Sequence, residues 1–302
     1  MKDVSRIGEF GLIETLKTYQ NLLPRVVKGI GDDAAVLKVR GGRYLLFTTD
    51  MLVEDVHFTR AMNARAVGCK ALACNLSDVA AMGGEPLFAV VSLGVPGRIT
   101  TRYVKSLYAG MSAMARQFGV SIVGGDTVRS KKVVINIALL GEVEKRRLIR
   151  RQGARTGDWI FVSGPLGGSF KSGRHLRFTP RVREARFLVE KFRPSAMIDL
   201  SDGLAGDLGH ILKASCVGAL IEESLIPCHR GATSRQALTD GEDFELLFTM
   251  PAVRARKLLE YKGPEKFRFY PVGVIRPRRE GFSIVRPDGR TELVKDRGFR
   301  HF

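Results

Sequence analysis

Carboxylates at the edges of apolar runs are the feature that most limits how this chain can fold. In the segment GIGDDAAVL, residues 29–37, the adjacent Asp32 and Asp33 stand between a Gly-Ile-Gly turn and an apolar run. Asp is depleted in strands and is seldom fully buried without a partner. The pair is therefore either an ordinary surface turn or part of an oxygen-rich metal site.

Other aspartates have the same kind of context, flanked by Gly, Ser or Thr beside an apolar run. They lie in TTDMLVEDVHF (Asp50, Asp55), LSDVAAMGG (Asp78), GGDTVRS (Asp126) and IDLSDGL (Asp199, Asp202). Each one alone is explained by a cap or a turn. Gathered in one site they would repel one another and would need cations. Hard oxygen ligands without a Cys or His pair indicate Mg²⁺ rather than zinc or iron, as in phosphoryl-transfer enzymes.

The familiar phosphate-binding and catalytic motifs are missing from the sequence. It contains no GxxxxGK[ST], no Rossmann GxGxxG and no HRD or DFG kinase signature, and no Ser-His-Asp or Cys-His arrangement follows from spacing. Phosphate groups would then be bound by backbone amides of Gly-rich loops and by arginines such as Arg129, Arg150 and Arg151.

Composition indicates a soluble protein of two domains. The chain has 302 residues, 44% hydrophobic and 26% charged. It has no apolar run long enough for a transmembrane helix and no secretory signal pattern at its N-terminus. Four cysteines without CxxC spacing favour free thiols in a reducing cytoplasm, with a structural zinc site the weaker alternative. The net charge of +18 is compatible with nucleic acid, phosphorylated substrates or a plain basic surface. No recognised nucleic-acid motif accompanies it, so nucleic acid is disfavoured.

Strand and helix signals alternate along the first half, and a basic stretch, 144–158, marks the crossing to a second half. We expect an N-terminal domain over 1–145, a C-terminal domain over 146–302, and an α+β fold of two layered units. The expected elements are strands at 43–50, 86–96, 132–143, 159–164 and 244–250, helices at 64–84, 101–119, 181–191 and 252–262, and a closing hairpin that turns at Asp288-Gly289.

Seven motifs in order resemble one family. GIGDDAAVL, TTDMLVEDVHF, KALACNLSDVAAMGGEP, IVGGDTVRS, GDWIFVSG, IDLSDGLAGDLGHI and GEDFELLFT are similar to those of thiamine-monophosphate kinases, within the aminoimidazole ribonucleotide synthetase-like superfamily. The resemblance runs from about Gly8 to Phe302. It implies ATP-dependent phosphorylation of thiamine monophosphate to thiamine diphosphate. It also implies a two-domain fold whose N-terminal sheet pairs across a homodimer, with ATP bound between the domains.

The resemblance also implies roles for individual residues. Those expected to bind several Mg²⁺ ions are Asp33, Thr48, Thr49, Asp50, Asp78, Asp126, Asp199 and Asp202. Those expected to contact ATP are Tyr108, Gly125, Asp126, Arg151 and Ser201. Those expected to contact thiamine monophosphate are His57, Glu242 and Phe299. Asp50, Asp126 and Arg151 would carry the catalysis, and Asp32 would be a turn-forming neighbour of Asp33. The sequence departs from the family at Asp240-Gly241, where Gly-Gly is usual, and looks shortened over 168–185 and 224–236.

The chemistry agrees with a direct transfer. The nucleophile is a phosphate oxygen that is already anionic near neutral pH, so no enzyme nucleophile or general base is needed. The obstacle is repulsion between two polyanions, which Mg²⁺ and Arg151 would reduce. Selenophosphate synthetase and the hydrogenase-maturation relative are disfavoured, because each needs a reactive Cys near one end of the chain. A basic nucleic-acid-binding protein is the alternative of another class, and the intact Asp segments argue against it.

Overall fold

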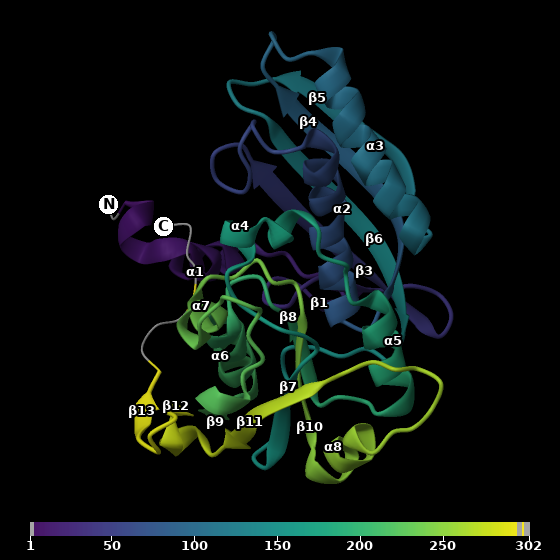
Figure 1. Cartoon of the computed structure of the whole chain (residues 1–302). Helices are drawn as coiled ribbons and strands as arrows, with labels where there is room; N and C mark the ends of the chain where they lie inside the picture. The colour runs from purple at the N-terminus through teal and green to yellow at the C-terminus, as the bar shows by residue number, and fades with distance from the viewer. Residues whose placement is uncertain (1–2, 295–297, 299–302) are drawn as a thin grey trace.

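The computed structural model describes residues 3–294 and residue 298, and its first half forms one β-sheet. The strands of this sheet are β1 (Val26–Lys28), β2 (Ala35–Lys38), β3 (Arg43–Val53), β4 (Glu85–Val95), β5 (Ser121–Arg129) and β6 (Val134–Glu144). They lie in the order β1-β2-β3-β6-β4-β5, in the upper part of Figure 1. The neighbours β4 and β5 are parallel, and the other neighbouring pairs are antiparallel.

Two helices, α2 (Ala64–Ala81) and α3 (Thr101–Phe118), cover one face of this sheet. They pack backbone against backbone, because a Cβ added at Gly68 would stand 2.0 Å from the carbonyl oxygen of Leu107. Most residues of α2 are buried, and the helix also contacts β8 and α5 of the second half. A helix that is buried on all sides needs no polar face, which explains its Ala-rich, non-amphipathic sequence.

The opposite face of the first sheet is open. Successive side chains of a strand point to opposite faces, so each long strand has one buried and one open row. In β6 the buried row includes Ile135, Ile137 and Leu139. The open face of the neighbouring strands carries exposed apolar side chains, namely Phe47, Met51, Phe88, Val90 and Val128. Several exposed apolar side chains on one face of a sheet are the kind of surface that interfaces use.

The second half forms a separate seven-stranded sheet. Its strands are β7 (Asp158–Val162), β8 (Ala196–Asp199), β9 (Gly218–Glu222), β10 (Leu246–Pro251), β11 (Tyr270–Arg276), β12 (Phe282–Val285) and β13 (Thr291–Leu293), in the order β13-β12-β9-β11-β7-β10-β8. Its helices are α4 (Ser169–Ser172), α5 (Val182–Lys191), α6 (Leu204–Ser215), α7 (Ser234–Thr239) and α8 (Ala252–Leu259). Single turns of 3₁₀ helix lie at η1 (Lys17–Tyr19), η2 (Arg174–Leu176), η3 (Glu223–Leu225) and η4 (Arg278–Glu280).

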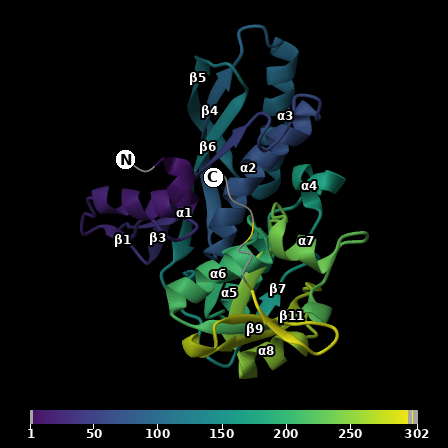
Figure 2. The same cartoon turned by 90° about the vertical axis from the view of Figure 1, so that its left-hand side faces the viewer.

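The first helix, α1 (Val4–Leu16), joins the start of the chain to the second half. Phe10 packs edge-on against the ring of His210 on α6, with the ring centroids 4.7 Å apart. Glu14 forms an ion pair of 2.9 Å with Lys213, one turn further along α6. In Figure 2 this helix lies beside the junction of the two halves.

The expected elements are present, with small differences at their ends. Strand β3 continues to Val53, and α8 ends at Leu259. The closing hairpin pairs β12 with β13, and the amide of Gly289 donates to the carbonyl of Arg286 in its turn. The α+β fold of two layered units is confirmed. Within the described residues, no helix combines the length and the apolar character that a membrane crossing requires.

Candidate active site

Three carboxylates from distant parts of the chain meet between the two sheets. Asp33 precedes β2, Asp78 lies in the last turn of α2, and Asp199 ends β8. One oxygen of each lies within 4.8 Å of the others. Oxygens around a single Mg²⁺ are separated by up to about 4.2 Å, because each lies about 2.1 Å from the ion. A small adjustment of side chains would therefore let one ion bind all three.

The carboxylate cluster, defined as Asp33, Asp78 and Asp199, is short of hydrogen-bond donors. The hydroxyl of Thr48 donates to Asp78 Oδ2 at 2.5 Å and to the backbone carbonyl of Asp33 at 3.2 Å. The guanidinium of Arg151 donates to Asp33 Oδ1 at 2.6 Å. The other oxygen of Asp33 is buried and has no hydrogen-bond partner among the described residues. A buried anionic oxygen without a donor is costly, and a cation at this point would compensate it.

Burial raises the pKa of each cluster carboxyl, and neighbouring carboxylates add to this at Asp78 and Asp199. Burial is the main cause for Asp199, whose pKa rises to about 8, and the charge of Asp33 adds to it. Burial also raises the pKa of Asp78 well above its ordinary value, followed by the charges of Asp50 and Asp199. Without a cation, the ionised form of these carboxyls is therefore disfavoured. Their oxygens are the ligands that a hard divalent cation prefers.

The structure places the predicted ligands of β3 on opposite faces of the sheet. Thr48 and Asp50 are on the face that α2 covers, toward the carboxylate cluster. Burial raises the pKa of Asp50 to about 6, and the neighbouring charge of Glu242 adds to this. Thr49 is exposed on the open face, where its hydroxyl contacts Asn136 Oδ1 at 3.1 Å.

Asp126 belongs to the open face as well. It lies on β5 in the same cross-strand row as Met51, Asn136 and Ser92. Three strand spacings of about 4.8 Å, or roughly 14 Å, separate it from β3. Within one copy of the chain, the structure therefore does not bring Asp126 to the carboxylate cluster.

Positive groups surround the turn that precedes Asp33. A Cβ added at Gly31 would stand 3.4 Å from the ammonium of Lys17 and 3.5 Å from that of Lys28, so both ammoniums reach the same point. The backbone amide of Arg151 donates to Asp32 Oδ1 at 3.0 Å, which agrees with a supporting role for Asp32. Two ammoniums and one guanidinium next to the cluster would attract a polyanion.

Two of the residues expected to contact thiamine monophosphate, His57 and Glu242, meet at one buried lysine, Lys70. The ammonium of Lys70 donates to the backbone carbonyl of His57 at 3.1 Å and to Glu242 Oε2. Glu242 has φ of +60°, and its amide donates to the carbonyl of Ser201 at 2.8 Å. Ser201 thus ties the loop of Glu242 to the segment that carries Asp199 and Asp202. The sequence did not single out Lys70, although a lysine inside an otherwise apolar helix is a signal.

Known proteins match the chain over its whole length. Residues 31–143 match the family model described as AIR synthase related protein, N-terminal domain. The thiamine-monophosphate kinase of Bacillus subtilis is 34% identical over 98% of this chain and 100% of its own length. The thiamine-monophosphate kinase of Aquifex aeolicus is 36% identical over 99% of each chain. The chain belongs to the thiamine-monophosphate kinase family.

A solved structure of the family has the same fold. It is described as "AaThiL complexed with AMPPCP and TMP", and it superposes with a TM-score of 0.86 at 33% identity, over 100% of this chain and 99% of that chain. The resemblance seen in the motifs is therefore confirmed, and so is the aminoimidazole ribonucleotide synthetase-like fold.

The other residues that the motif resemblance predicts as site residues lie in several places. Tyr108 is half-buried on α3, and Gly125, with φ of +155°, lies on β5 beside Asp126. A Cβ at Gly125 would stand 1.9 Å from the carbonyl oxygen of Val91, so any larger residue here would clash with β4. Packing alone therefore requires a glycine at this position. Phe299 lies outside the described residues.

The motif IDLSDGLAGDLGHI, which carries Asp199 of the carboxylate cluster, also carries a second group of possible metal ligands, namely Asp202, Asp207 and His210. Asp202 donates its amide to Asp207 Oδ2 at 3.0 Å, and His210 completes a set whose ligand atoms lie within 4.8 Å of one another. Burial raises the pKa of Asp207 well above its ordinary value, and burial lowers the pKa of His210 to about 4. Asp207 was not predicted as a site residue, and it fixes the backbone of the predicted ligand Asp202.

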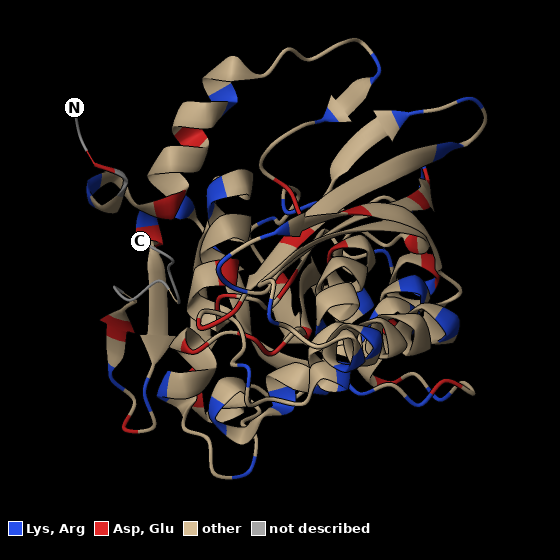
Figure 3. Ribbon diagram, turned by 90° about the horizontal axis from the view of Figure 1, so that it is seen from above, with Lys and Arg blue, Asp and Glu red and all other residues tan. Residues whose placement is uncertain are grey.

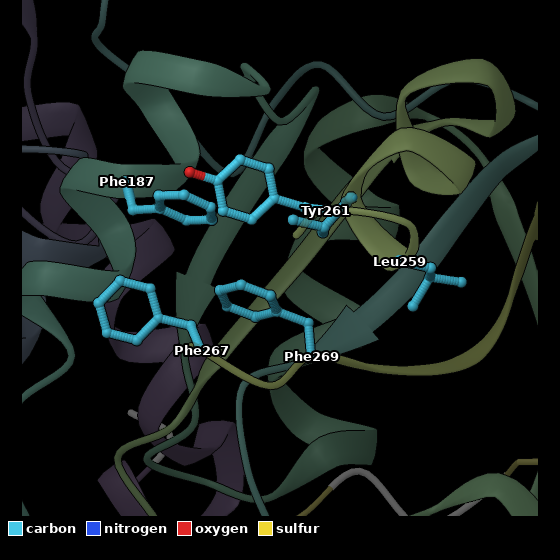
Figure 4. Close-up of a pocket in the computed structure, with 6 residues that line it drawn as sticks. Phe187, Leu259, Tyr261, Phe267 and Phe269 are labelled. Carbon is cyan, nitrogen blue, oxygen red and sulfur yellow. The ribbon is translucent and has the colours of Figure 1, made fainter. Parts of the chain in front are cut away.

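A cavity lined by aromatic side chains lies between α5 and α8. Its volume is about 120 Å³, and it is shown in Figure 4. Its lining includes Phe187, Tyr261 and Phe269 and none of the predicted site residues, so we regard it as part of the aromatic core. Figure 3 shows Lys and Arg spread over many helices and loops around the outside of the molecule.

Proposed function

We infer that this protein phosphorylates thiamine monophosphate with ATP and forms thiamine diphosphate. Family membership over the full length of the chain supports the activity. The observation that carries the inference to this chain is its carboxylate cluster, which needs cations and lies beside positive groups suited to a polyphosphate. The solved relative is a complex with AMPPCP, an analogue of ATP, and with TMP, which abbreviates thiamine monophosphate.

We propose Mg²⁺ as the metal, bound by the carboxylate cluster with Asp50 and Asp202 adjoining it. The chemistry of the donor set, which consists of carboxylate and hydroxyl oxygens, fits this ion. When bound, Mg²⁺ neutralises the charge of phosphate oxygens and so lowers the repulsion between two phosphorylated substrates. Thr48, which donates to Asp78, would hold that carboxylate in place for the ion.

The chain's own contribution to the transfer is positioning. Asp32 and Asp33 hold Arg151 through its amide and its guanidinium, so this cation is oriented before any substrate binds. We propose that Arg151 and Ser201 contact ATP and that Arg151 stabilises charge on the transferred group. A general base is unnecessary because the attacking oxygen of the substrate is already anionic.

Thiamine monophosphate would be bound by His57, Glu242 and Phe299. The backbone amide of Val53 donates to Nδ1 of His57 at 3.0 Å, which makes Nδ1 an acceptor and leaves the proton of the neutral ring on Nε2. A carboxylate such as Glu242 and an aromatic ring are suitable partners for the cationic thiazolium. Phe299 remains a proposal from the family alone.

The experiment that tests this function is incubation with ATP, Mg²⁺ and thiamine monophosphate, followed by chromatography of the products. We expect thiamine diphosphate and ADP in equal amounts, and no product when EDTA replaces Mg²⁺. Thiamine should not be accepted in place of its phosphate. Consumption of ATP without thiamine diphosphate would contradict the function, and so would phosphorylation of thiamine itself.

We further propose that the two sheets mark domains over 1–145 and 146–302 and that the protein is a cytoplasmic homodimer. Its four cysteines are free, as expected in a reducing compartment. The open apolar face of the first sheet is the surface that a second copy would cover. Thr49 and Asp126 lie on that face, and we propose that they act at the subunit interface.

A substitution on the open face tests the dimer. Val128 is 55% exposed on β5, and Val128→Lys would place a charge in the apolar interface. We expect light scattering to show a dimer for the wild type and a monomer for this variant, with much of the activity lost. Val253→Lys is the matched control, because Val253 is 67% exposed on α8, and this variant should remain dimeric and active. A monomeric wild type with full activity would contradict the proposal.

A further inference from the structure

Lys70 is a buried cation for which the transfer itself gives no reason. It belongs to α2, its side chain is 0% exposed, and it is among the largest fully buried side chains of the described residues. A buried ammonium is costly unless it is paired and hydrogen-bonded. The partners of Lys70 are therefore what justifies its presence.

Those partners come from the two halves of the chain. His57, whose carbonyl accepts from the ammonium, follows β3 of the first sheet. Glu242, whose carboxylate forms the ion pair, lies in the loop before β10 of the second sheet. Lys70 therefore links the two residues that we propose to bind thiamine monophosphate, although the chain separates them widely.

The loop of Glu242 is held rigidly toward Lys70. Glu242 and Phe244 both have positive φ, at 60° and 51°, a conformation that side-chain-bearing residues rarely adopt. The amide of Glu242 bonds to the carbonyl of Ser201 and the amide of Phe244 to that of Leu200, both at 2.8 Å. Such strain persists only where the surroundings impose it, often at ligand sites.

The charges around Lys70 explain what its loss would do. Burial raises the pKa of Asp50, the neighbouring charge of Glu242 raises it further, and the charge of Lys70 lowers it, so the ammonium opposes the repulsion between the two carboxylates. Two further titratable groups lie near Lys70, namely Cys74, one turn along α2, and His175 on η2. Burial is the main cause of the pKa shift of each, and the charge of Lys70 lowers the pKa of both. Without the ammonium, Glu242 would lose this ion pair while the charge of Asp50 remained nearby, and its carboxylate would turn away from the His57 segment.

We propose that Lys70 is a positioning residue that holds Glu242 against the His57 segment and thereby sets the affinity for thiamine monophosphate, but not for ATP. This inference rests on the proposed function. It concerns the part of the site that we propose for thiamine monophosphate. The positive groups that we propose for ATP are elsewhere, at the Gly31 turn and at Arg151. A buried ion pair that merely joined the two halves would affect both substrates alike.

The test compares the KM values of the two substrates in Lys70→Met, Lys70→Arg and the wild type. Lys70→Met should raise the KM for thiamine monophosphate about 10- to 100-fold, the loss typical of a hydrogen bond to a charged group, and leave the KM for ATP within about twofold. Lys70→Arg keeps a cation and should recover a large part of the loss. Lys257→Met, on the exposed side of α8, is the matched control and should behave as the wild type.

A double variant guards against misfolding. Lys70→Met/Glu242→Gln removes both charges of the pair, which proteins tolerate better than the loss of one partner. Its KM for thiamine monophosphate should be within about twofold of that of Glu242→Gln alone, because the two residues act through one contact. A further large increase would overturn the proposal, as would equal changes in both KM values for Lys70→Met. If the wild type and Lys257→Met form no thiamine diphosphate, the proposed function is wrong. If both are active and Lys70→Met equals them, only the role of Lys70 is wrong.

Discussion

Replacing Asp78 by asparagine is expected to abolish phosphoryl transfer and, at the same time, to stabilise the metal-free protein. Burial and the charges of three neighbouring carboxylates, Asp50, Asp199 and Asp33, oppose the charge of Asp78. Asparagine has the same shape and still accepts from the hydroxyl of Thr48, but it is a poorer ligand for Mg²⁺. We expect turnover to fall by at least about 100-fold, as for other losses of electrostatic stabilisation. The melting temperature in EDTA should rise, because a repulsive buried charge is removed.

A buried aspartate away from the cluster provides the control. Asp158 is 3% exposed, and its carboxylate accepts from the amide of Arg155 at 3.0 Å. Asp158→Asn should leave turnover intact and should not raise the melting temperature. Normal turnover of Asp78→Asn would refute the metal assignment. Lost turnover with a lower melting temperature would mean that the substitution damaged the fold instead.

The second large effect concerns Mg²⁺ and pH. The pKa of Asp199 is about 8 in the folded protein and near its ordinary value of 3.8 when unfolded. The metal-free folded state therefore binds more protons than the unfolded state between these values, so its free energy of unfolding falls as pH rises. His175 and His210, whose pKa burial lowers to about 4, act in the opposite direction only below about pH 6.5. The range from about pH 6.5 to 8 is thus the one that reports on the carboxylates.

Thermal unfolding in that pH range, with EDTA or with excess Mg²⁺, is the measurement. In EDTA the melting temperature should decrease toward pH 8. The increase caused by Mg²⁺ should grow with pH, since binding requires ionised carboxylates and stabilises only the folded state. Asp78→Asn should show a smaller response to both variables. An equal Mg²⁺ effect at about pH 6.5 and pH 8 would contradict a buried carboxylate site.

The sequence predicted the elements, and it indicated part of the cluster, for physical reasons. A carboxylate next to a strand or helix end can be recognised from composition, because apolar runs and Gly, Ser or Thr mark the ends of elements. Asp33, Asp78 and Asp199 were identified in this way, and they do meet. All three lie at the ends of elements that pack on one hydrophobic core, and the alternation of apolar runs with Gly, Ser or Thr in the sequence indicates such ends.

Other features depended on pairings that no local pattern contains. The alternation of strand side chains separates Thr49 from Asp50, yet which face α2 covers follows only from tertiary packing. The position of Asp126 depends on the strand order, which places β6 and β4 between β3 and β5. The contact between Lys70 and Glu242 joins residues of different halves, and its signal was limited to one lysine inside an apolar helix.

Helix α2 carries both Lys70 and Asp78 and is enclosed by the sheet, by α3 and by the second half. An α-helix rises about 1.5 Å per residue, so these two positions are about 12 Å apart along its axis. The distance between the proposed metal site and the proposed thiamine monophosphate site is therefore set by one helix. Inserting or deleting one residue between them would rotate one end by about 100° relative to the other. A pair of bound substrates that did not span this distance of about 12 Å could not reach both sites at once.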